Sequence, residues 1–90
     1  MPSIRFAGKI VYDDGTEIDG ITGEYVSYAP FMGPKSWRGH CLVPAGKAVI
    51  PGECRIVFND GKEARIVIDS LSVGPGQTTI AFFKGSGSSP

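Results

Sequence analysis

A cysteine thiol beside a histidine can act as a nucleophile, so His40, Cys41 and Cys54 are the first side chains to weigh for catalysis. His40 is the single histidine and directly precedes Cys41. Their segment has strand character, and neighbouring side chains on a strand point to opposite faces, where they cannot share a proton. A nucleophile would need His40 to meet Cys54 or a basic partner from elsewhere. We therefore expect no enzyme, and a surface histidine on the third strand.

The remaining chemical groups give no clear cofactor or metal site. Two cysteines are too few for a disulfide framework or a zinc site, so we expect two buried thiols, with a single disulfide as the alternative. The acidic group at residues 13 to 19 lacks the full pattern of a calcium loop, and its acids are explained by a turn. A small enzyme remains an alternative. It predicts a concave pocket that collects titratable groups such as His40, Asp69 and Glu24.

The segment from Ile68 to Gly76, IDSLSVGPG, resembles in part the ligand loop of PilZ domains, which are six-stranded barrels that bind a cyclic dinucleotide. That loop has an Asp or Asn, a Ser two residues on and a Gly three beyond that, with paired arginines upstream. Here Ser70 and Ser72 stand one and three residues after Asp69, and no Arg-x-x-x-Arg precedes the barrel. We therefore assign no family.

The most suggestive segment for function runs from Tyr25 to His40, YVSYAPFMGPKSWRGH. Loops between strands are normally polar, whereas this one gathers aromatic residues, methionine and arginine, the types enriched at protein interfaces. We expect the Pro30–Trp37 loop to bind a protein partner or a second copy of the chain. The alternative is that Phe31 and Met32 plug an open barrel end while Trp37 joins the core in line with Cys41 and Val43. The candidate contact residues are Tyr28, Phe31, Met32, Lys35, Trp37 and Arg38.

A single-stranded nucleic-acid platform is a second functional class, because aromatic side chains with nearby cations are what base stacking needs. The charge balance makes nucleic acid an unlikely partner: nine Lys and Arg face nine Asp and Glu, for a net charge of zero. The longest apolar run is far below the ~20 residues that span a bilayer. We expect a cytoplasmic protein without membrane contact, and no small-molecule ligand can be inferred.

Architecture is the best-supported inference, because the stretch KIVYDDGTE from Lys9 to Glu17 returns as RIVFNDGKE from Arg55 to Glu63. Each copy turns at an Asp-Gly and predicts a β-hairpin. In the second copy a three-residue turn, with glycine in the left-handed conformation, places Ile56 opposite Ala64 on a clean apolar face. The same rule pairs Ile10 with Ile18 inside and Lys9 with Asp19 outside.

Turn signals and apolar alternation extend these hairpins to six strands. They are expected near residues 3–12, 16–28, 36–43, 53–59, 62–72 and 77–84, with a bulge or bend near Gly20 and Gly23 and a connector from Pro44 to Gly52 that has room for one short strand. The chain is expected to be all-β: two similar hairpin or meander halves forming a six-stranded antiparallel barrel or barrel-like sandwich. Residues 1–84 would form the domain and 85–90 a flexible Gly/Ser tail.

Overall fold

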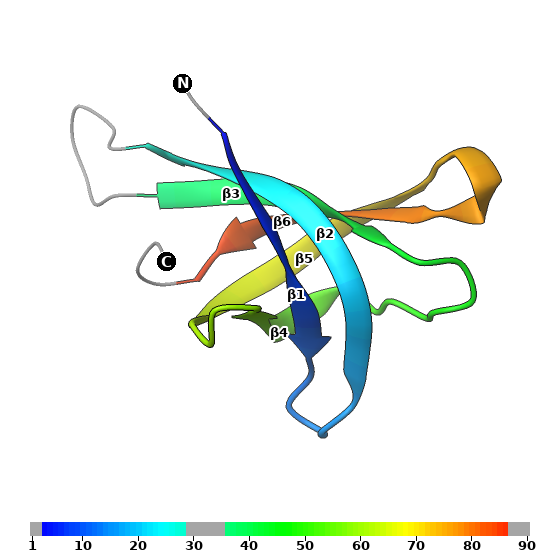
Figure 1. Ribbon diagram of the computed structural model, residues 1–90, viewed down its shortest axis with the longest axis horizontal. Coiled ribbons are helices and arrows are strands. Elements are labelled where there is room, and N and C mark those ends of the chain that lie inside the picture. The colour runs from blue at the N-terminus through cyan, green and yellow to red at the C-terminus, as the bar shows by residue number, and fades with distance from the viewer. Residues whose placement is uncertain (1–2, 29–35, 87–90) are drawn as a thin grey trace.

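A computed structural model, which describes residues 3–28 and 36–86, has six antiparallel strands and no α-helix in the described part (Figure 1). The strands close into a barrel in the order β1-β2-β3-β6-β5-β4. Two consecutive meanders therefore meet along the β3–β6 and β1–β4 seams. The all-β prediction is confirmed. Of the two predicted arrangements, a barrel and a barrel-like sandwich, the structure is a closed barrel. The strands are β1 Ile4–Val11, β2 Glu17–Tyr28, β3 Ser36–Val43, β4 Gly52–Phe58, β5 Glu63–Val73 and β6 Thr79–Gly85.

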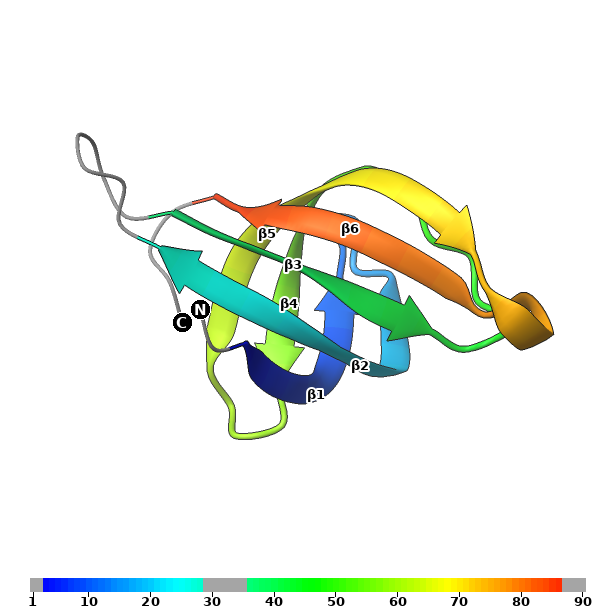
Figure 2. The same ribbon diagram turned by 90° about the horizontal axis from the view of Figure 1, so that it is seen from above.

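Strand boundaries lie close to those predicted, with two differences. β6 runs through Gly85, a residue that the sequence assigned to the tail, and the connector from residue 44 to 51 contains no strand. Between β5 and β6 a short 3-10 turn covers Pro75–Gln77. Both Gly76 and Gln77 have positive φ there, which lets the chain reverse tightly. Figure 2 shows this β5–β6 hairpin extending past the other strands.

Both Asp-Gly hairpins form the predicted three-residue turn. Gly15 and Gly61 have φ values of +92° and +91°, the left-handed conformation that glycine adopts at little cost. The amide of Gly61 donates to the carbonyl of Phe58 at 2.9 Å, and the carboxylate of Asp60 accepts from the Lys62 amide at 3.0 Å. The first hairpin has the corresponding bonds, Gly15 to Tyr12 and Thr16 to Asp14. The register follows: Ile56 lies opposite Ala64 and Ile10 opposite Ile18.

A bulge in β2 lies at the predicted bend. The β1–β2 register shifts between Gly8 and Ile10, so β2 carries an extra residue before Ile21. Gly20 takes a φ of +75° at this point. Lys9 lies at the shift, and its ammonium bonds the Glu17 carboxylate at 2.8 Å. That bond raises the pKa of Lys9, and the charge of Asp19 adds to the effect.

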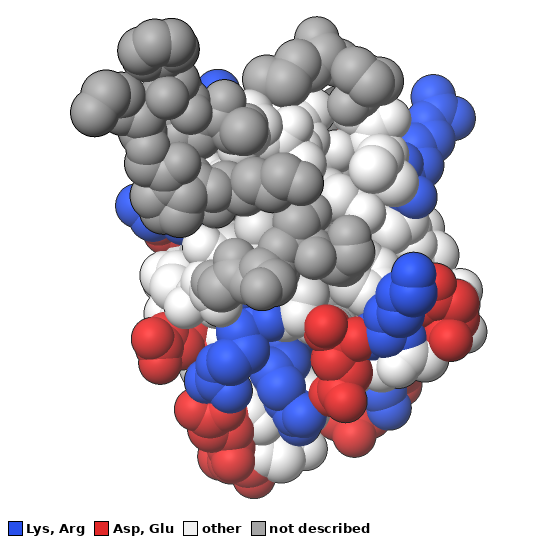
Figure 3. Space-filling view, turned by 90° about the vertical axis from the view of Figure 1, so that its left-hand side faces the viewer, with Lys and Arg blue, Asp and Glu red and all other residues white. Residues whose placement is uncertain are grey.

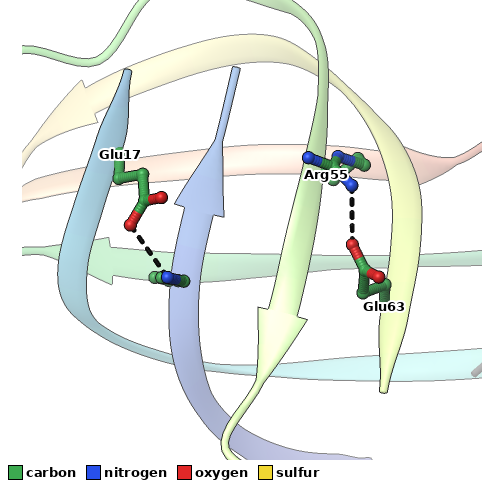
Figure 4. Close-up of polar contacts among 4 residues, drawn as sticks. Glu17, Arg55 and Glu63 are labelled. Carbon is green, nitrogen blue, oxygen red and sulfur yellow. Dashed lines mark hydrogen bonds and ion pairs between the residues drawn. The ribbon is translucent and has the colours of Figure 1, made fainter. Parts of the chain in front are cut away.

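The outer surface carries charges of both signs side by side. On the face seen in Figure 3, acidic and basic side chains interleave without forming a patch of one sign. The two Asp-Gly hairpins carry equivalent ion pairs, Lys9 with Glu17 and Arg55 with Glu63 at 2.7 Å (Figure 4). All four side chains are at least one-third exposed, so each pair contributes below about 1 kcal/mol to stability.

The core fills the barrel with alternate side chains from every strand. Isoleucines dominate its centre, and aromatic rings gather toward one end: Trp37 meets Tyr25 edge-on at 5.6 Å between centroids and Phe83 at 5.8 Å. Complete burial of these apolar groups drives folding. The cluster comprises Ile10, Ile18, Ile21, Tyr25, Trp37, Cys41, Val43, Cys54, Ile56, Phe58, Ala64, Ile66, Ile68, Ala81 and Phe83.

Candidate interaction surface

The structure separates the predicted contact residues into three groups. Trp37 lies in the core with only 2% of its surface exposed, in line with Cys41 and Val43, which is the alternative that the sequence left open for it. Tyr28 and Arg38 face outward on neighbouring strands. Phe31, Met32 and Lys35 lie outside the described residues, and so does most of the Pro30–Trp37 loop.

Tyr28 and Arg38 belong to an outer sheet surface that we call the β2–β3–β6 face. Strand pairing aligns Val26, Arg38 and Lys84 in one row, and a second row brings together Glu24, His40 and Phe82. These side chains point outward because their neighbours in sequence, such as Trp37, Cys41 and Phe83, point into the core. The face consists of Thr22, Glu24, Val26, Tyr28, Ser36, Arg38, His40, Leu42, Ile80, Phe82 and Lys84.

Arg38 is the most distinctive group on this face. Its guanidinium carbon lies 5.7 Å from the centre of the Tyr28 ring, within the range of a cation–π interaction. The three other arginines each lie within 4.0 Å of a carboxylate, whereas no carboxylate in the described part of the chain pairs with Arg38. The planar guanidinium therefore keeps its hydrogen-bond donors available for an external group, while Tyr28 restricts its position.

Two large apolar side chains also lie exposed on this face. Leu42 and Phe82 are each 41% exposed, and the Phe82 ring lies 6.2 Å from the His40 ring. Leu42 and Phe82 were not among the contact residues predicted from the sequence, because that prediction rested on the unusual loop and not on the outward positions of the strands around it. Strand alternation was the available signal: Leu42 and Phe82 fall out of phase with the buried Cys41, Val43, Ala81 and Phe83.

A pocket of about 650 Å³ opens over part of the same face. Tyr28, Arg38, Phe82 and Lys84 contribute to its lining, and so do two carboxylates, Glu24 and Asp69. Each carboxylate is held by a cation, Glu24 by Arg5 at 3.3 Å and Asp69 by Lys84 at 3.8 Å. The pocket thus combines aromatic surface, compensated charges and the uncompensated Arg38.

The thiols lie apart from this surface. Cys41 and Cys54 are fully buried and unbonded to each other, as the first of the two sequence interpretations predicts. Burial raises the pKa of Cys41 to about 12 and the pKa of Cys54 to about 11, since a thiolate would lose its hydration. Both therefore stay protonated near neutral pH, and a protonated thiol is a poor nucleophile.

The acidic turn residues have structural partners. Hydrogen bonds from Thr16 lower the pKa of Asp14, because they stabilise the charged carboxylate. Within residues 3–28 and 36–86, no three His, Cys, Asp or Glu side chains gather closely enough to hold a metal ion.

Comparisons with known proteins found no match for the chain. It matches no protein-family model, and no curated protein or solved structure is significantly similar to it. No helix of the described residues is long and apolar enough to cross a membrane.

Proposed function

We propose that this barrel is a non-catalytic binding module that contacts another protein through the β2–β3–β6 face. The observation that carries the proposal is Arg38, stacked on Tyr28 and free of any carboxylate among the described residues, on the same face as the exposed Phe82 and Leu42. Arginine and aromatic side chains are enriched among the residues that dominate binding energy at protein interfaces. A partner that presents a carboxylate flanked by apolar groups would match this arrangement in both charge and polarity.

Single-stranded nucleic acid is the second candidate, and two contacts favour it: the cation–π pair of Arg38 with Tyr28, and the ring pair of His40 with Phe82. Two observations favour protein instead. Lys84 is already paired with Asp69, and Glu24 adds negative charge to the lining of the same pocket. A polyanion gains most of its affinity from several unpaired cations, and this face offers few.

Affinity capture with matched variants tests the proposal. The immobilised wild-type protein is compared with the double variant Arg38→Ala/Phe82→Ala, using quantitative mass spectrometry of the proteins retained from cells that express it. The control is Arg65→Ala/Ile50→Ala, which removes an arginine and an exposed apolar side chain from other parts of the surface. A partner retained by wild type and control but lost by the double variant is the expected result. Equal retention by all three would contradict the proposal.

Titration of a fluorescein-labelled oligothymidylate at low and moderate salt tests whether the protein binds single-stranded nucleic acid. A nucleic-acid binder should bind more tightly as salt falls and should lose affinity in the Tyr28→Ala and Phe82→Ala variants. We expect no binding even at low salt, because the net charge is zero. Salt-dependent binding that needs Tyr28 and Phe82 would replace the protein-partner proposal.

A further inference from the structure

The outer half of β5 has an edge that no other strand covers. β5 pairs with β4 only as far as Ile68, which lies opposite Gly52. Pro51 precedes Gly52, and proline has no amide hydrogen with which to continue the ladder. From Ser70 to Val73, β5 pairs with β6 alone, in the hairpin that Figure 2 shows projecting from the barrel.

The backbone groups on this edge can be identified from the hairpin's hydrogen bonds. The Gly74 amide donates to the Thr78 carbonyl at 2.7 Å. Because hydrogen-bonded pairs alternate along an antiparallel ladder, Ser72 and Ser70 direct their backbone groups toward β6. Those of Leu71 and Val73 point away from it. Among residues 3–28 and 36–86, nothing forms a hydrogen bond with these outward groups.

Beyond the register shift between Ile68 and Ser70, this edge carries little that would block strand addition. All five residues from Asp69 to Val73 are exposed, and Val73 and Leu71 show 76% and 39% of their surface. Proteins usually protect such an edge with lysine, proline or a covering segment. Here the segment contains neither lysine nor proline, and its single charge, Asp69, is compensated by Lys84. An exposed, apolar and unprotected edge is a template for another strand.

We infer that this edge pairs with the same edge of a second copy, antiparallel about a two-fold axis at Ser72. In that register Leu71 lies opposite Val73 of the second copy, and Val73 lies opposite Leu71. Each outward-facing residue then meets an outward-facing residue, so each pair exchanges both backbone hydrogen bonds. Ser72 lies opposite Ser72 of the second copy. The segment satisfies the self-complementarity that a two-fold interface requires, and this favours a second copy over an unrelated strand.

The dimer is expected to be weak and concentration-dependent. A contact of five residues per chain falls below the roughly 1,200 Å² that stable complexes bury. The inference is independent of the proposed partner face, because Arg38 and Phe82 take no part in the pairing.

Sedimentation velocity over a concentration series tests the pairing with two variants at one position. Val73→Pro removes an amide hydrogen that has no partner within the monomer, and proline is tolerated at a strand edge. Val73→Thr keeps the amide and a β-branched shape. We expect wild type and Val73→Thr to dimerise and Val73→Pro to raise the dimer dissociation constant at least about tenfold, the loss of a net hydrogen bond in each half of the interface. Arg38→Ala should leave dimerisation unchanged.

Amide hydrogen exchange locates the contact in the same samples. The Leu71 and Val73 amides should exchange more slowly as the protein concentration rises, while circular dichroism shows that Val73→Pro remains folded. A wild-type protein that stays monomeric up to a concentration on the order of 1 mM would overturn the inference. So would a dimer that Val73→Pro does not weaken, or one that Val73→Thr abolishes. Exchange at residues 71 and 73 that is independent of concentration would overturn it as well.

Discussion

Single residues decide how the aromatic end of the barrel is built. Trp37 occupies the space where a side chain at position 85 would lie, so the last residue of β6 has to be glycine. The indole N–H is buried without a hydrogen-bond partner among the described residues. Trp37 therefore contributes packing against Tyr25 and Phe83 and no polar bond. The sequence predicted Trp37 in the loop or in the core. It could not predict that Trp37 packs against Gly85, because this contact joins β3 to β6, which are far apart in sequence.

Replacing Gly85 with alanine should destabilise the fold. The added methyl group would overlap the indole ring, and overpacking of this kind costs about 1–3 kcal/mol. Urea denaturation followed by tryptophan fluorescence measures the change. Lys84→Ala, at the preceding exposed position, is the control and should cost much less. A Gly85→Ala protein as stable as wild type would show that Trp37 does not pack as described.

The buried thiols make stability depend on alkaline pH. Both thiols ionise near pH 9.0 when unfolded, whereas burial raises the pKa of Cys41 to about 12 and of Cys54 to about 11 in the fold. The folded protein therefore holds more protons above pH 9, and the stabilisation present below that pH is lost as pH rises through these values. Each thiol steepens this loss as the pH rises from 9.0 toward its folded pKa.

Urea titrations at about pH 8 and about pH 10.5 test this dependence, with Cys41→Ala/Cys54→Ala as the control. The double variant starts from lower stability because it leaves cavities, but its stability should fall less steeply with pH. Equal slopes in the two proteins would mean that the thiols ionise as readily in the fold as in the unfolded chain.

At the scale of elements, the hairpins were the most predictable part of the fold. Their turn type follows from a local rule: only the three-residue turn puts Ile56 opposite Ala64 and keeps one face apolar. The ion pair of Lys9 with Glu17 was not predictable in the same way, because the register places Val11, not Lys9, opposite Glu17. The β5 overhang also escaped prediction. The overhang exists because β4 begins at Gly52, opposite Ile68, while β5 continues to Val73. The sequence of either strand alone does not indicate how far the two overlap.

The two turn glycines should cost similar amounts when replaced. Gly15→Ala and Gly61→Ala each force alanine into the left-handed region, at about 1–2 kcal/mol. Glu63→Gln, which removes the Arg55 ion pair, should cost less than about 1 kcal/mol because the pair is exposed. Thermal or urea unfolding ranks the three variants. Glu63→Gln proving costlier than Gly61→Ala would mean that surface charge, and not backbone conformation, holds the hairpin.

For the whole molecule, closure of the barrel decides which surfaces remain for binding. Side chains fill the interior, so contacts with other molecules fall to the outer faces and to the overhanging hairpin. Composition correctly indicated a β-rich chain, yet the outer face around Phe82 and Leu42 formed only because β6 pairs with β3, which is distant from it in sequence. The proposed partner surface is therefore a product of the topology.

Site-specific photo-crosslinking in cells tests the partner face most directly. A benzoylphenylalanine placed at Phe82 should capture one defined partner protein, and Arg38→Ala in the same chain should abolish the product. The same group placed at Arg65, on a strand outside this face, should not capture that partner. A defined product at position 82 that depends on Arg38 is the predicted result. The same products from both positions, or none at position 82, would contradict the proposal that the β2–β3–β6 face binds a protein.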